Sequence, residues 1–309
     1  MQPPAAQWQP TTGVTDHQGK PLLPEQDFFA PPPPEIGEVV SAWTSLVRGK
    51  SSWGAYVVTG AALAGLLAGA GLVEKGLVSG SRYLWPIFSA AAAALPAWWF
   101  ARFSHRVSYV GTQGVAVLRC SGSREAVKTE TLFVFRDAKA LKMNELIQDM
   151  LLGFDATYNF IWTDAEGREK FKIRHMSEDW LRSGPPARSD YNLARSAELS
   201  WSRYLMELGR EGLAQNGWME FKIKDGEFVR VGQGFLELGR SGRTERLKSE
   251  ELSIFRGTGA LRIARKDDTQ GAGGVLEKDG FDFETAPMPN LMAFLLALKS
   301  LTDFNLTDA

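Results

Sequence analysis

Two long stretches without a charged side chain dominate the hydrophobic and polar pattern of this chain, residues 53–73 and residues 83–101. Each is close to the roughly 20 residues that an α-helix needs to cross the ~30 Å hydrocarbon core of a bilayer. Residues 74–82 connect them and allow only a tight antiparallel turn. We therefore predict a two-helix transmembrane hairpin over residues 53–101. The alternative is a pair of helices buried in a soluble core, although soluble helices of this length usually carry a polar face.

Charges beside the two stretches predict the orientation of the hairpin, because cytoplasmic flanks carry an excess of Lys and Arg. The outer flanks are basic, whereas the connection mixes both signs. The residues concerned are Arg48, Lys50, Arg102, His105 and Arg106 on the outer flanks, and Glu74, Lys75 and Arg82 in the connection. We expect an integral protein of the inner (cytoplasmic) membrane with both termini in the cytoplasm.

Small residues recur at every fourth position of the first stretch, at Ala61, Gly65 and Gly69. This spacing places them on one helix face and lets another helix approach closely. The neighbour is either the second stretch of the same chain or a second copy of the protein. The pattern therefore predicts a helix-packing face and leaves a homo-oligomer open.

The segment before the first stretch divides in two. Residues 1–35 are rich in Pro, Gln and Thr and include four consecutive prolines, so we predict a disordered tail. Residues 36–50 hold apolar side chains at helical spacing, from Ile36 through Val40 and Trp43 to Val47. A short amphipathic helix directly before a span is typical of the membrane interface, and we predict one here.

An internal repeat follows the two stretches. Residues 113–141 align without a gap with residues 233–261, and many side chains recur 120 positions later. The identical ones in the first copy are Gln113, Gly114, Leu118, Ser121, Gly122, Glu125, Lys128, Glu130, Leu132, Phe135, Arg136, Ala140 and Leu141. The repeat is too long for a solenoid unit, so each copy should have its own core. We predict a duplicated domain.

Alternating apolar and polar residues predict that each copy is built mainly from strands. In the second copy Met219, Phe221 and Ile223 alternate with charged residues, and Asp-Gly pairs supply hairpin turns. Asn290 suits the N-cap of a last helix. Each copy thus has about seven short strands and one C-terminal helix. We expect a first domain over 102–186, a helical connector over 187–217 and a second domain over 218–309.

Seven antiparallel strands followed by one helix resemble the pleckstrin-homology (PH)-like barrel. The whole layout resembles the membrane-anchored PH-like proteins of bacteria, with two tandem copies. The resemblance implies an α+β membrane protein in which a two-helix transmembrane hairpin precedes two PH-like β-barrels, each with a C-terminal helix. It also implies a binding task, because the loops between early strands of such barrels often hold cations that meet anionic headgroups.

Basic residues cluster at the corresponding stretch of each copy. The candidate lipid- or anion-binding residues are Arg240, Arg243, Arg246 and Lys248 in the second copy and Arg119, Arg124 and Lys128 in the first. Near an anionic leaflet each Lys or Arg contributes about 1 kcal/mol. The alternative is a solvated hairpin whose charges oppose aggregation.

The remaining chemistry of the sequence favours binding over catalysis. A single cysteine excludes an internal disulfide, and three scattered histidines do not form a metal motif. The net charge of −1 argues against a nucleic-acid partner. The sequence holds no nucleophile elbow or Walker loop, so we expect no enzyme activity, metal or cofactor.

We therefore expect a membrane-anchored scaffold that presents tandem domains to a protein partner and to anionic lipid. The first alternative is an accessory subunit of a membrane complex that acts through its transmembrane hairpin. The second is a membrane enzyme whose polar pocket the sequence does not reveal.

Overall fold

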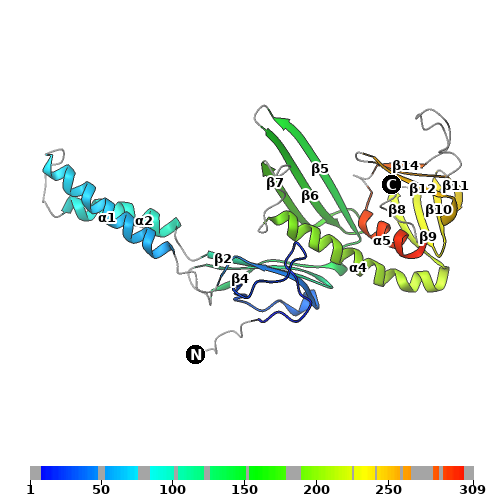
Figure 1. Ribbon diagram of the computed structural model, residues 1–309, viewed down its shortest axis with the longest axis horizontal. Helices are drawn as coiled ribbons and strands as arrows, with labels where there is room; N and C mark the ends of the chain where they lie inside the picture. Colours follow the sequence, from blue (N-terminus) through cyan, green and yellow to red (C-terminus); the bar gives the residue numbers. More distant parts are fainter. Residues whose placement is uncertain are drawn as a thin grey trace.

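The computed structural model describes residues 8–47, 53–75, 84–100, 104–121, 126–150, 153–178, 189–224, 226–240, 242–257, 260–265, 281–284 and 288–302. Within these residues the chain forms one apolar helix pair and two folded units, arranged one after the other along the long axis of the molecule (Figure 1). Unit 1 contains the first seven strands, and unit 2 contains the last seven strands and the last helix.

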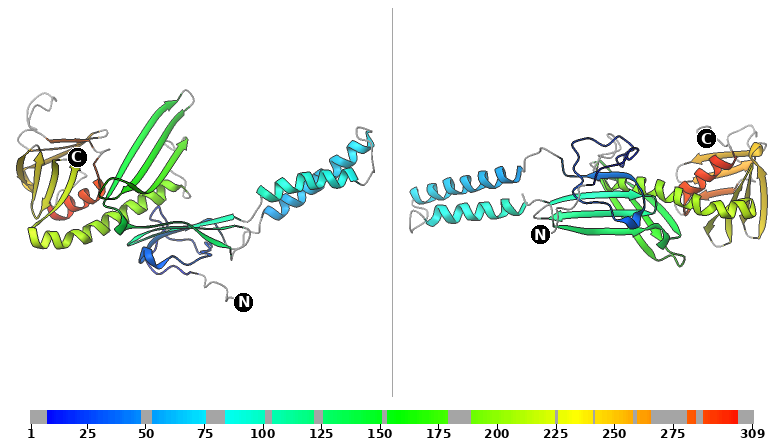
Figure 2. Two further views of the ribbon diagram at one scale, coloured as in Figure 1. Left: turned by 180° about the vertical axis from the view of Figure 1, so that it is seen from behind. Right: turned by 90° about the horizontal axis from the view of Figure 1, so that it is seen from below.

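A four-stranded antiparallel sheet forms the base of unit 1, in the order β1-β2-β3-β4. The helix pair is an insertion into this sheet, since α1 and α2 lie between β1 and β2 in the chain. The bounds are β1 Val39–Thr44, α1 Trp53–Glu74, α2 Leu84–Phe100, β2 Ser104–Gly111, β3 Gly114–Ser121 and β4 Val127–Val134. The helix pair therefore leaves from one end of the sheet (Figures 1 and 2).

A second, three-stranded sheet completes unit 1, in the order β5-β6-β7. The short 3-10 helix η2 separates it from β4. The bounds are η2 Phe135–Asp137, β5 Ala140–Met150, β6 Gly153–Thr163 and β7 Glu169–Glu178. The two sheets enclose an aromatic core whose largest fully buried side chains are Phe135, Phe160, Trp162 and Trp201.

The long helix α4, Asp190–Asn216, joins the two units. The hydroxyl of Ser189 accepts the Asn192 amide at its start, and Gly217 ends it in the left-handed conformation. It packs on β2, β3 and β7 of unit 1, and on β8 and α5 of unit 2. Because Leu205 packs against the cores of both units, α4 ties them together.

Unit 2 repeats the element order of unit 1, with sheets β11-β10-β9-β8 and β12-β13-β14 and a closing helix α5. The bounds are β8 Trp218–Lys224, β9 Glu227–Gly232, β10 Phe235–Arg240, β11 Arg243–Lys248, η3 Ser249–Glu251, β12 Leu252–Gly257, β13 Ala260–Arg265, β14 Phe281–Glu284 and α5 Leu291–Thr302. Seven strands precede the helix, as the alternation in the sequence indicates.

The predicted fold class is wrong in two respects. First, the sheets are open. Among the described residues no strand ladder joins the four-stranded sheet of either unit to its three-stranded sheet, so neither unit is a closed barrel. The 3-10 helices η2 and η3 interrupt the chain where a continuous strand would pass from one sheet to the next.

Second, the predicted two-span hairpin does not hold. Of the described helices, only α1 is long and apolar enough to cross a membrane, over Val57–Glu74. The second helix lies against α1, but it has 17 residues and a proline near its start, Pro86, and falls short of a second span. Uncharged residues beyond its ends made the run in the sequence longer than the helix.

The predictions for the N-terminal segment are also wrong. The described part of the tail, from residue 8, covers the face of the β1–β4 sheet that lies opposite α4, where Phe28 and Phe29 are buried. The described part of the segment predicted as an interfacial helix, residues 36–47, begins with the last residue of the 3-10 helix η1, Pro34–Ile36, and continues into strand β1. Both faces of β1 are covered, with Val39 in one core and Val40 against the other. An apolar run buried on both faces resembles a helical stripe in the sequence.

The gapless repeat does not correspond to equivalent places in the two units. Val115 of β3 lies opposite Phe133 of β4, and Leu236 of β10 lies opposite Leu247 of β11. Equivalent positions are therefore 121 apart on the first strand (236 − 115) and 114 apart on the second (247 − 133). The reason is that the β3–β4 hairpin of unit 1 is longer than the β10–β11 hairpin of unit 2, both in its strands and in its connection.

Identical residues can thus have different surroundings. Leu132 is 42% exposed on edge strand β4, whereas Leu252, 120 positions later, is completely buried at the start of β12. The order of the helices and strands therefore shows the duplication more clearly than the gapless sequence alignment does.

Candidate functional site

The apolar helix pair is the largest departure of this structure from an ordinary soluble surface. It extends away from unit 1 and touches neither unit along its length (Figure 2). Large apolar side chains on both helices are exposed, namely Val57, Leu63, Leu66, Leu67, Leu72, Trp85, Ile87, Phe88 and Leu95. A contiguous apolar surface of this kind marks contact with a membrane or another protein.

The predicted helix-packing residues lie where α1 meets α2. A Cβ atom on Gly65 would come within 2.9 Å of the Ala90 Cα, and one on Gly69 within 2.7 Å of the Pro86 Cα. Ala61 is half-buried on the same side. This face is occupied by α2 of the same chain, so a second copy cannot use it.

The basic candidates of the first copy lie at the end of the β1–β4 sheet from which the helix pair leaves. Arg119 on β3 is opposite Lys128 on β4, and its Nε donates to the Ser104 hydroxyl at the start of β2. Arg119 and Lys128 are both exposed. Arg124 lies outside the described residues.

The basic candidates of the second copy are mostly paired with acids on neighbouring strands. Arg240 forms an ion pair of 3.0 Å with Glu227, and Arg246 one of 2.8 Å with Glu237. Lys248 lies 3.9 Å from Glu250. Arg243 is exposed opposite Arg240 on the adjacent strand.

One of these pairs, Arg246 with Glu237, belongs to a ladder of alternating charge across the outer face of the β8–β11 sheet. Glu220, Arg230, Glu237 and Arg246 lie opposite one another in register on the four strands. Burial would raise the pKa of Glu237, but hydrogen bonds from Arg246 and Arg230 lower it overall. The carboxylate thus stays ionised between two guanidinium groups, and these arginines are not free to bind an anion.

Aromatic rings complete this outer face. The guanidinium of Arg230 lies 4.2 Å from the ring of Trp218 and 4.3 Å from that of Phe228, and Arg246 lies 4.2 Å from Phe235. Such cation–π contacts contribute about 0.5–1 kcal/mol each at exposed sites. In unit 2, charged and aromatic side chains therefore form the outer face of the four-stranded sheet. In unit 1 the N-terminal segment covers the corresponding face.

The two basic groups do not form one surface. The β1–β4 sheet adjoins the helix pair, whereas β10 and β11 lie at the opposite end of the molecule (Figure 1). Of the described candidates, Arg119 and Lys128 therefore lie on the sheet next to the helix pair, and the second-copy residues do not.

A cleft of about 740 Å³ lies between the N-terminal segment, β1 and α4. Residues 11–19 form one wall, residues 38–41 the floor, and α4 the other wall, with Met292 of unit 2 at one side. Arg195, Glu198 and Arg203 are the charged residues that α4 contributes. The cleft combines polar groups with a partly apolar lining, a mixture that is typical of ligand sites.

His17 lies at the base of this cleft and links the N-terminal segment to β1 and β2. Its Nδ1 is 2.8 Å from the Ser41 hydroxyl and its Nε2 is 2.8 Å from the Ser108 hydroxyl, while Ser41 contacts Ser196 of α4 at 2.5 Å. Burial, and secondarily the charge of Arg106, lower the pKa of His17 to about 3. Such a weak base suits a neutral structural link better than proton transfer.

Glu198 is the buried carboxyl group of the cleft. Burial raises its pKa, and the attraction of Arg195, with which it forms an ion pair one helical turn away, opposes that rise. Arg195 is thus paired with Glu198. Arg203, the other arginine that α4 contributes to the cleft, has no ion pair with any described residue. Nothing in the sequence pattern marked these residues, because they come from segments far apart in the chain.

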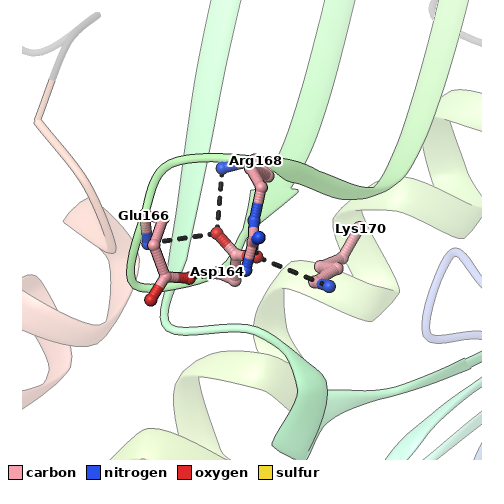
Figure 3. Close-up of polar contacts among 4 residues, drawn as sticks. All are labelled: Asp164, Glu166, Arg168 and Lys170. Carbon is pink, nitrogen blue, oxygen red and sulfur yellow. Dashed lines mark hydrogen bonds and ion pairs between the residues drawn. The ribbon is translucent and has the colours of Figure 1, made fainter.

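A second polar cluster, at the turn between β6 and β7, is structural (Figure 3). Asp164 accepts the backbone amides of Glu166 and Arg168 and pairs with the side chains of Arg168 and Lys170. Burial would raise the pKa of Asp164, but these hydrogen bonds and charges lower it to about 2. Both carboxylate oxygens of Asp164 therefore have their partners within this cluster.

No group of three or more His, Cys, Asp or Glu residues that could hold a metal ion occurs among the described residues. Neither a protein-family model nor a curated protein matches this sequence. The functional reading therefore depends on the geometry alone.

Proposed function

We propose that this protein is a membrane-attached binding protein, in which the apolar helix pair holds the chain to a bilayer and the folded units present the cleft beside α4 to a partner. The observation that supports this proposal is the exposure of the helix pair: Leu67 is 75% exposed and Phe88 66%. Fully burying one such side chain contributes about 1.5–3 kcal/mol, so nine of them strongly favour a lipid environment.

The position of the pair in the fold supports the same proposal. It is inserted between two adjacent strands and stands clear of both units, so an internal core does not explain its apolar surface. The cleft lies at the β1 edge of unit 1, between the N-terminal segment and α4, with Met292 of unit 2 at one side. A partner bound there would be held close to the membrane.

The alternative of an accessory subunit that acts through the helix pair would have to use another helix face. Gly65 and Gly69 are occupied by α2, whereas Gly60 and Gly71 have no neighbouring atoms within 4 Å of a Cβ position. The two readings differ in whether a partner contacts the cleft or the helices.

Cysteine labelling of the full chain in native membranes tests the attachment. In a Cys120→Ala background, Leu67→Cys on α1 and Leu208→Cys on α4 each provide one thiol at a position that is exposed in the structure. We expect a charged, membrane-impermeant maleimide to label position 208 in opened vesicles and to label position 67 only after detergent is added. Equal labelling of both positions without detergent, together with release of the chain by alkaline carbonate, would refute the proposal.

A further inference from the structure

Three basic residues lie in a row near the end of the β1–β4 sheet from which the helix pair leaves. In this antiparallel sheet the end of β1, the start of β2, the end of β3 and the start of β4 all lie at that end, since Ser104 is opposite Ser121 and Cys120 is opposite Val127. The chain therefore leaves β1 toward α1, enters β2 after α2 and passes from β3 to β4 at this end of the sheet.

A row of cations crosses the sheet close to this end. Arg106 on β2 lies opposite Arg119 on β3, which lies opposite Lys128 on β4. Arg106 is compensated, because it pairs with Asp190 at 2.7 Å and with Glu130 at 3.7 Å. Arg119 and Lys128 are exposed and have no ion pair with any described residue.

In the sequence, the residues between these strand and helix ends include four cations and one acid, which lie outside the described residues. They are Arg48, Lys50, Arg102, Arg124 and Glu125. The whole chain has a net charge of −1, so this concentration is not a property of the overall composition. A basic margin beside an apolar membrane-attached segment is complementary to an anionic leaflet.

The position of the Arg119 guanidinium is fixed by a hydrogen bond. Arg119 donates through its Nε to Ser104, which follows the last residue of α2, Phe100, by four positions. The guanidinium is therefore held at the base of the helix pair. If the pair enters a bilayer, this end of the sheet faces the headgroup layer.

We propose that Arg119 and Lys128 form a binding surface for the phosphate of anionic phospholipid headgroups in the leaflet that the helix pair enters. This inference rests on the membrane attachment proposed above. It assigns the lipid contact to unit 1 alone, since Arg240 and Arg246 are paired with acids and the strands that hold the second-copy candidates lie at the far end of the molecule. The contact would orient unit 1 and its cleft relative to the membrane.

The test uses the full chain in phosphatidylcholine nanodiscs, with native mass spectrometry measuring the dissociation constant of the first bound phosphatidylglycerol. The test variant combines Arg119→Gln with Lys128→Gln, and the matched control combines Arg243→Gln with Lys248→Gln, which are likewise exposed at strand ends of unit 2. Each cation near an anionic leaflet contributes enough for about a fivefold change in affinity. We expect a loss of about 25-fold in the test variant and less than twofold in the control.

Each outcome has a distinct meaning. Equal affinity of the wild type for phosphatidylglycerol and phosphatidylcholine, or an equal loss in both double variants, would overturn the lipid surface while leaving membrane attachment standing. Failure of the chain to enter nanodiscs would instead refute the attachment itself. A further arm adds glycerol phosphate at constant ionic strength; displacement of phosphatidylglycerol at matched concentration would show a site for free phosphate compounds and overturn the lipid assignment.

Discussion

Replacing Asn290 should loosen unit 2 from unit 1, because its side chain makes three hydrogen bonds across the boundary between them. Its Oδ1 accepts the Leu141 amide at 2.8 Å and the Trp201 indole N–H at 2.9 Å, and its Nδ2 donates to the Lys139 carbonyl at 3.2 Å. The residue was predicted from the sequence as an N-cap of the last helix. In the structure its side chain instead binds β5 and α4, across the boundary between the units.

The expected loss of free energy follows from the two donors that lose their acceptor, the Leu141 amide and the Trp201 indole N–H. Trp201 is completely buried and Leu141 is 4% exposed, so neither N–H gains water when Oδ1 is removed. Each unsatisfied buried donor costs about 1–3 kcal/mol, which makes about 3 kcal/mol a moderate expectation for the pair. At that value, opening between the units becomes about 100-fold more frequent.

Three substitutions separate the side chain from the backbone, since Asn290 has a φ of 57°. Asn290→Gly removes the hydrogen bonds and tolerates this conformation, Asn290→Ala adds about 1 kcal/mol of left-handed strain, and Asn290→Asp keeps the acceptor oxygen. Hydrogen exchange measured by mass spectrometry in peptides covering residues 139–143 and 291–302 should show lost protection for Gly, slightly more for Ala, and little for Asp. Unchanged exchange in Asn290→Gly, or equal loss in Asn290→Asp, would refute this reasoning.

Two further predictions concern the helix pair and the cleft. Gly65→Leu should separate α1 from α2, since a Cβ there meets the backbone of Ser89 and Ala90. Gly60→Leu is the control, because a Cβ at that position has no neighbouring atom within 4 Å. We expect a lower thermal unfolding temperature in detergent for Gly65→Leu only. The pKa of His17 is lowered from 6.5 to about 3, so the unfolded chain binds a proton that the folded chain does not, and stability should fall by up to about 5 kcal/mol as the pH drops from 6.5 to 3. His17→Gln should flatten that part of the urea-unfolding pH profile; an unchanged slope would show that other groups cause it.

Much of the local structure could be predicted from periodicity. The two uncharged runs form α1 and α2 nearly to the residue, the strands of unit 2 follow the alternation that includes Met219 and Phe221, and a helix begins just after Asn290. These features depend on neighbours in the chain. A period of two or of 3.6 residues therefore contains the necessary information.

The errors concern contacts between distant segments. Proline-rich composition suggested disorder for the tail, yet Phe28 and Phe29 supply enough apolar surface to cover a sheet that is completed only by residues near 120. The cleft was missed for the same reason, because His17, Ser41 and Ser196 come from three separate segments. Sheet closure was overestimated because strand count alone does not say which strands pair.

The place of the helix pair in the chain makes the packing of α1 on α2 and the folding of unit 1 interdependent. Strand β1 precedes the helices and β2 follows them, yet Ala42 must pair with Tyr109 to build the sheet. An unstructured loop between them would oppose that pairing through closure entropy that grows with its length, whereas two helices packed through Gly65 and Gly69 bring their outer ends together. A fragment that starts after the helices lacks β1 and the N-terminal cover, and it therefore exposes the apolar face around Tyr109 and Leu118. Lipid binding by such a fragment would report that exposed core, so the basic surface has to be tested in the full chain.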